Sequence, residues 1–137
     1  MDETISIVLF SGTDDKLNAA AVLAAGAAAL GRPVKIFLQY WALDAFRADR
    51  IEADHGLAPE AGEAGRVAVE AAKKAGQAHW AATLRMAKEL GEVDIQACSA
   101  SLEILKIKKE HLDPLVDGVE GVAAFYINAG EGQIIFI

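Results

Sequence analysis

The chain has 137 residues, 53% of them hydrophobic, and a formal net charge of −7 at pH 7. This length suits a single domain with a substantial core, and the apolar content argues against intrinsic disorder. The negative charge, with no cluster of Lys and Arg to offset it, argues against nucleic acid and anionic lipid as main ligands. We therefore expect one domain over residues 1–137 that binds neither nucleic acid nor membrane.

No segment predicts membrane insertion or export. Residues 17–30 are the most apolar stretch, but they fall short of the ~20 residues that a bilayer span needs. The first residues, Met1-Asp2-Glu3, are acidic, whereas a signal peptide begins with basic residues. The single cysteine cannot form an intramolecular disulfide, which suits a reducing compartment. These features predict a cytoplasmic protein.

The first third of the chain has the pattern of a strand, a helix and a second strand. Residues 4–10 are a short apolar, β-branched run, and Ser11-Gly12-Thr13 then begins a turn that can cap a helix. An alanine-rich helix follows up to Leu30, where Gly and Pro end it. Residues 34–39 predict the second strand, and Tyr40-Trp41 come directly after it. This spacing predicts a right-handed parallel crossover.

The middle of the chain predicts a loop, helical structure and a third strand. Residues 47–66 are acidic and contain glycine, which predicts a variable loop or insertion. Residues 66–90 have a helical pattern, as one long helix or as two that break near Gly76. The residues that share one face of this helical stretch are Trp80, Leu84 and Ala87. Residues 93–97 predict a third strand that ends directly at Cys98.

The last forty residues contain one ambiguous segment. Residues 112–119 could hold a brief fourth strand, which Pro114 would confine to the sheet edge. Residues 133–137 predict a terminal strand, and residues 121–129 fit either a strand or a helix. We prefer the helix, because a strand there could reach the terminal strand only as a hairpin.

Together these elements predict an α/β fold of three layers, α/β/α, with a mainly parallel sheet of about five strands. Ligands bind such sheets at the carboxyl ends of the strands. Three segments follow strands and carry useful side chains: Ser11-Gly12-Thr13, Tyr40-Trp41 and Cys98-Ser99. The sequence alone leaves open whether they meet in space.

Cys98 has the most distinctive chemistry among these residues. A thiol at the start of a helix faces unpaired N–H groups and the positive end of the helix dipole, which favour the thiolate. A thiolate is the nucleophile for persulfide transfer, peroxide reduction or disulfide exchange. A buried structural cysteine would occupy the same place, so the position supports both interpretations equally. The absence of a second cysteine excludes a dithiol cycle within one chain.

The other candidates also have a simpler structural interpretation. Ser11-Gly12-Thr13 could bind an anion through backbone N–H groups, but a capped turn between strand and helix explains the same residues. Tyr40 and Trp41 could line a pocket beside the thiol, although such aromatic residues are more often found in cores and interfaces. The three histidines, His55, His79 and His111, lack the spacing of metal ligands. We therefore expect no metal, and no sequence motif predicts a cofactor.

Two long segments resemble a known family. The first, at 8–43, reads VLFSGTDDKLNAAAVLAAGAAALGRPVKIFLQYWAL, and the second, at 93–137, begins VDIQACSASLEIL with an ACxxS-type turn. Both are similar to the DsrE/DsrF/DsrH-like superfamily, particularly its DsrE2-like branch. The resemblance covers nearly the whole chain except residues 47–66.

The resemblance implies a compact α/β/α domain, usually assembled as a homo-oligomer. It also implies a part in sulfur relay, with sulfur held as a persulfide on Cys98 and exchanged with a small sulfur-carrier protein or a persulfide donor. Backbone N–H groups of Ser99 to Ser101, together with the turn at Ser11 to Thr13, would stabilise the anion.

The leading hypothesis is therefore a sulfurtransferase or persulfide carrier. A non-catalytic module that binds a small ligand or a partner is the alternative, and a thiol peroxidase with one cysteine is the third. The rate at which Cys98 is alkylated would separate the first two, since a binding module needs no reactive thiol.

Overall fold

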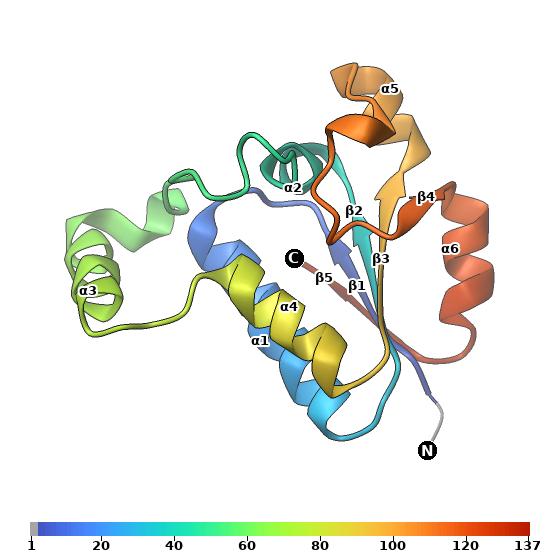
Figure 1. Ribbon diagram of the computed structural model, residues 1–137, viewed down its shortest axis with the longest axis horizontal. Coiled ribbons are helices and arrows are strands. Elements are labelled where there is room, and N and C mark those ends of the chain that lie inside the picture. Colours follow the sequence, from blue (N-terminus) through green and yellow to red (C-terminus); the bar gives the residue numbers. More distant parts are fainter. Residues whose placement is uncertain (1–2) are drawn as a thin grey trace.

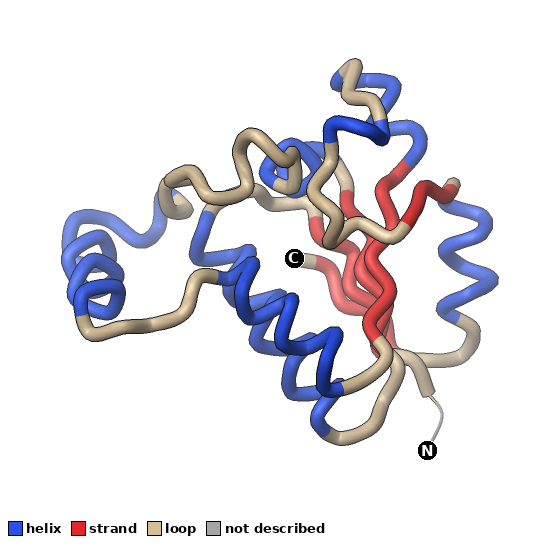
Figure 2. Tube along the Cα trace, in the orientation of Figure 1, coloured by secondary structure: helices blue, strands red, loops and turns tan. Residues whose placement is uncertain are grey.

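The computed structural model describes residues 3–137 (Figures 1 and 2). The strands are β1 (Ile5–Leu9), β2 (Val34–Leu38), β3 (Val93–Cys98), β4 (Gly118–Glu120) and β5 (Gln133–Phe136). The α-helices are α1 (Asp14–Ala29), α2 (Tyr40–Ala45), α3 (Gly62–Lys74), α4 (Trp80–Leu90), α5 (Ser99–Leu105) and α6 (Val122–Ala129). Two 3₁₀ turns are η1 (Pro59–Ala61) and η2 (Lys109–His111).

The five strands form one parallel sheet in the order β4-β3-β2-β1-β5. Helices flank both faces of the sheet, as the red sheet between blue helices in Figure 2 shows. The predicted α/β class, the parallel sheet and the three layers are confirmed. Since parallel strands require a crossover at every connection, all carboxyl ends lie along one edge of the sheet.

Helices α1 and α4 cover the first face, side by side in Figure 1. The buried side of α1 consists mainly of alanine, which lets the helix axis approach the sheet closely. The face predicted for the second helix is also confirmed, because Trp80, Leu84 and Ala87 are all buried. These residues join Ile7, Ile36 and Ile95 of the central strands in the main core.

Helix α6 covers the second face by itself (Figure 1). It confirms the helical interpretation of residues 121–129. Its Phe125 ring stacks on Phe37 of β2 with centroids 4.8 Å apart. Helix α6 has two and a quarter turns at most and buries only Phe125 and Ala129, so part of this face is left uncovered. Ile134 and Phe136 of the edge strand β5 are accordingly exposed.

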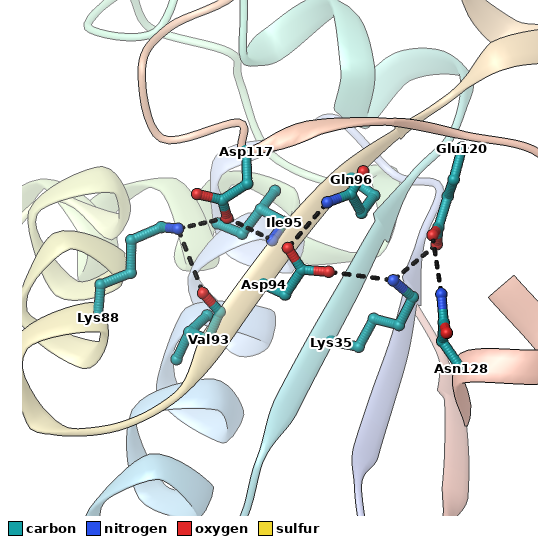
Figure 3. Close-up of polar contacts among 9 residues, drawn as sticks. All are labelled: Lys35, Lys88, Val93, Asp94, Ile95, Gln96, Asp117, Glu120 and Asn128. Carbon is teal, nitrogen blue, oxygen red and sulfur yellow. Dashed lines mark hydrogen bonds and ion pairs between the residues drawn. The ribbon is translucent and has the colours of Figure 1, made fainter. Parts of the chain in front are cut away.

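A buried ion network lies under α6 (Figure 3). The Lys35 side chain of β2 is 5% exposed, and its Nζ lies 2.8 Å from Glu120 Oε2 and 3.1 Å from Asp94 Oδ2. Asn128 of α6 donates to the other oxygen of Glu120 at 3.3 Å. Gln96 donates to Asp94 at 2.8 Å. The network therefore connects β2, β3, β4 and α6 through one ammonium group.

The brief edge strand expected within residues 112–119 is present as β4, although it begins only at Gly118 and extends to Glu120. The Asp113 carboxylate accepts the N–H of Leu115, which bends the chain into a turn at this point. The Asp117 carboxylate accepts the N–H of Ile95 at 2.8 Å, and the Asp117 backbone N–H donates to the Ile95 carbonyl at 2.7 Å (Figure 3). The strand ladder with β3 then continues from Gly118.

The region between β2 and β3 also differs from expectation. Helix α2 begins at Tyr40, where the sequence analysis predicted no helix. The loop expected over residues 47–66 ends early, because α3 already begins at Gly62. The two-helix alternative for residues 66–90 is confirmed, with the break at Gly76, whose φ is +96°. Across residues 3–137, no helix is both long and apolar enough to cross a membrane.

Replacement of Lys35 by Met tests the ion network. The substitution strands the Glu120 carboxylate in a buried position, and we expect the free energy of unfolding to fall by about 3–5 kcal/mol in urea titrations. The double variant Lys35→Met/Glu120→Gln removes both charges and should recover most of this loss. A double variant as unstable as Lys35→Met would show that the carboxylate is not what makes the single substitution costly.

Candidate functional site around Cys98

Cys98 is the last residue of β3 and the residue that precedes α5. The predicted placement between a strand and a helix is therefore confirmed. The cysteine is 4% exposed and packs with Phe37 and Phe125 in a small cluster that also contacts Val8. The thiol thus lies on the second face of the sheet, beneath α6.

Gln39 is the polar side chain that contacts the thiol. Its Nε2 lies 3.9 Å from Cys98 Sγ, within the range of a hydrogen bond to sulfur. The amide N–H donates and the sulfur accepts. The sequence analysis missed this residue. The signal was the register of the sheet, in which Leu38 pairs with Ala97 and the next residues, Gln39 and Cys98, become neighbours.

Ser101 fixes the backbone at the end of the neighbouring strand. Tyr40 has a φ of +44°, in the left-handed region that costs a residue with a side chain ~1–3 kcal/mol. Its backbone N–H donates to the Ser101 hydroxyl at 3.1 Å, and Ser101 is almost fully buried. The predicted binding residue Ser101 therefore positions Tyr40, and through it the start of α2.

Tyr40 and Trp41, which follow β2, contact residues that follow β1. The Tyr40 ring lies 5.0 Å from that of Phe10 and 5.7 Å from that of Trp41. Gly12 packs against the Trp41 backbone so closely that a Cβ there would lie 2.4 Å from the Trp41 carbonyl oxygen. Trp41 itself is 55% exposed. The sequence left open whether the three segments meet in space. Trp41 contacts Gly12 and the Tyr40 N–H reaches Ser101, whereas Cys98 itself is contacted by Gln39, the residue before Tyr40.

Ser11, Gly12 and Thr13 do not line the space around the thiol. They line a separate cavity of ≈370 Å³, with Trp41, Lys16 and Arg50 among its other lining residues. Both cations already have partners, since Lys16 lies 3.9 Å from Glu60 and Arg50 lies 3.0 Å from Asp44. This turn was expected to stabilise an anion at Cys98. It instead lies away from the thiol and packs against Trp41 through Gly12.

Ser99 lies at the exposed edge of the site. Its hydroxyl would be 3.7 Å from a Cβ at Gly121, the residue that precedes α6. Ser99 thus adjoins the point where α6 begins. Residues 3–137 contain no group of three or more His, Cys, Asp or Glu side chains arranged to hold a metal ion.

Comparison with known proteins gives one family. The family model described as DsrE/DsrF/DrsH-like matches residues 1–137. An uncharacterized protein, YrkE of Bacillus subtilis (strain 168), is 31% identical over 150 residues, which cover 94% of this chain and 92% of that one. The ychN protein of E. coli has a similar fold, with a TM-score of 0.56, 15% identity and coverage of 98% and 99% of the two chains. A protein of unknown function from Methanobacterium thermoautotrophicum, MTH1491, has a TM-score of 0.52 at 13% identity, with coverage of 98% of each chain.

Proposed function

The chain belongs to the DsrE/DsrF/DrsH-like family, and from this membership we propose that it is a sulfur-trafficking protein that carries sulfur as a persulfide on Cys98. The observation that supports the proposal is the setting of the only thiol. Cys98 lies at the carboxyl end of a central strand, with the Gln39 amide directed at its sulfur. A lone thiol of this kind stays reduced in the cytoplasm, which is the compartment that the proposal assumes.

The transfer needs one nucleophile and one donor. The Cys98 thiolate attacks the outer sulfur of a donor persulfide, R–S–SH, and forms a new S–S bond. The S–S bond of the donor breaks, and R–S⁻ leaves with the electron pair of that bond. The product is Cys98–S–SH, which an acceptor thiolate on a small sulfur-carrier protein can attack in the same way.

Sulfur transfer from Cys98 requires α6 to move, because the thiol is buried beneath it. The helix is suited to this movement, since Phe125 and Ala129 are its only buried residues. Glycines flank it on both sides, Gly121 before the helix and Gly130, with a φ of +57°, after it. Such positions absorb large changes in backbone angle at little steric cost. Phe125, stacked on Phe37, is the main contact that holds α6 closed over the sulfur.

Intact-mass measurement after incubation with glutathione persulfide tests the proposed activity. We expect the mass to increase by one sulfur atom, and the increase to disappear on reduction and in Cys98→Ser. An unchanged mass, or equal loading of Cys98→Ser, would contradict the proposal. Those results would favour the non-catalytic binding module, which the burial of Cys98 fits.

Alkylation by iodoacetamide tests the role of α6. We expect Phe125→Ala to speed alkylation of Cys98 by roughly threefold to tenfold, because the aromatic stack that holds the helix closed is lost. Ala123→Ser is the matched control on the same helix, since Ala123 is exposed and lies outside the interface proposed below. Equal rates in the two variants would show that the thiol is reached without opening of α6.

We also propose that the protein assembles as a homo-oligomer through the second face of the sheet. Neither α6 nor β5 carries a charged residue, although the whole chain has a net charge of −7. The exposed apolar residues on these two elements are Val122, Tyr126, Ile127, Ile134 and Phe136. Strand β5 is also an edge strand whose outer backbone groups are open to pairing. Two copies that meet here bury apolar surface with little charge repulsion.

Light scattering coupled to size exclusion measures the assembly. We expect the unmodified chain to exceed the mass of one chain, and Phe136→Lys to shift it to one chain. Leu30→Lys is the control, because Leu30 is an exposed leucine at the C-terminal end of α1, outside the proposed interface. It should leave the mass unchanged. A monomeric unmodified chain, or equal effects of the two lysines, would contradict this interface.

A further inference from the structure

Helix α3 is an amphipathic helix that has no buried residue. It is set apart from α1 and α4 in Figure 1, where it forms the green element at the far side of the molecule. Gly65, Val69 and Ala72 are partly covered and lie at helical spacings of four and three, so they mark one inward face. A helix of 13 residues is marginal in water without tertiary packing, so this face needs something to pack against.

A cavity of ≈600 Å³ lies between the inward face of α3 and the starts of α1 and α4. This volume is within the range of small-molecule sites, ~300–1,000 Å³. Its apolar lining comes from Ala53, Leu57, Ala68, Val69, Ala72, Ala78 and Trp80. A second cavity of ≈370 Å³ adjoins it, and the two share the lining residues Asp14, Asp54, Leu57, Val69 and Lys73. Helix α3 therefore covers a cavity that no side chain of the protein fills.

The charged side chains around the larger cavity are mainly acidic. They are Asp14, Asp15, Glu52 and Asp54, with Lys73 as the one lysine or arginine. Asp14 is held rigidly, because one oxygen accepts the Trp80 indole N–H at 3.0 Å and the other the His55 backbone N–H at 3.0 Å. The Gly56 backbone N–H, together with the Lys73 charge, lowers the pKa of Asp54 below its ordinary value. The rim thus carries more carboxylates than cations, above an apolar floor.

We propose that this cavity binds a protonated organic amine, with its hydrocarbon body against Val69, Ala72 and Trp80 and its ammonium group at the acidic rim. An apolar floor favours a hydrocarbon body, and excess carboxylates favour a cation over a neutral or anionic ligand. The site is separate from the proposed sulfur chemistry, because neither Cys98 nor Gln39 lines the cavity.

Three ligands that share one body and differ in charge test the inference. They are 2-phenylethylamine, 2-phenylethanol and 3-phenylpropanoate, titrated against the Trp80 fluorescence of a Trp41→Phe chain, which has no other tryptophan. We expect saturable binding of the amine, weaker binding of the alcohol and none of the carboxylate. Equal binding of all three, a preference for the carboxylate, or no response to any of them would overturn the proposal.

Two pairs of measurements locate the binding. Asp54→Asn should weaken the affinity for the amine by about two- to fivefold, the range for one partly exposed ion pair. The affinity for the alcohol should be unchanged. Ala72→Phe fills the cavity and should abolish binding of both, whereas Ala71→Phe, on the exposed side of the same helix, should not. Unchanged amine binding in Ala72→Phe would place the ligand elsewhere and refute the site. Far-UV circular dichroism of both phenylalanine variants verifies that α3 remains folded.

Discussion

The buried ammonium group of Lys35 is the contact on which the second face of the sheet depends. It lies between carboxylates from two other strands, Asp94 of β3 and Glu120 of β4. A buried cation is tolerated only where it is paired, so the strands must bring these carboxylates to it. This matters most for β4, which has three residues and pairs only with the end of β3. So short an edge strand has few backbone hydrogen bonds of its own, and the ion pair supplements them.

The same ion pair determines how Cys98 is covered. Glu120 is the register partner of Cys98 and the last residue of β4, so Gly121 and α6 must start beside the cysteine. Asn128, near the end of α6, returns to the Glu120 carboxylate and fixes the direction of the helix. Phe125, between these two anchors, then falls on Phe37 and the sulfur. Burial of the thiol is therefore a consequence of charge pairing across three strands and of a helix that has one possible starting point.

Local sequence patterns predicted the elements whose stability is local or strongly periodic. The runs at β1, β2 and β5 are short and apolar, the Ala-rich helix has clear ends, and Trp80, Leu84 and Ala87 mark a buried face at helical spacing. The position of Cys98 followed from the same logic, since it is the residue where an alternating strand ends.

What the sequence did not predict depends on contacts between distant segments. Lys35 is one lysine in an apolar run, and nothing local shows that its charge is buried between carboxylates 59 and 85 residues away. Gln39 becomes a neighbour of Cys98 only through the pairing of β2 with β3. The left-handed Tyr40 is held by the hydroxyl of Ser101, 61 residues further along the chain, so the start of α2 had no local signal.

The β1–α1 turn lies between the two proposed sites without lining either, and the sheet separates their working parts. Asp14 at the rim of the amine cavity begins α1, two residues after Gly12, and Gly12 packs on Trp41 beside the strand end that carries Gln39. A continuous set of contacts thus runs from the cavity to the thiol.

Contiguity alone does not couple two sites, because coupling requires an element with two arrangements that both ligands bias. The element proposed to move at the thiol is α6, and the helix that covers the amine cavity is α3. These helices lie on opposite sides of the sheet in Figure 1, so an amine that orders α3 has no differential contact with the open and closed forms of α6. We therefore expect sulfur loading of Cys98 and amine binding to be independent of each other.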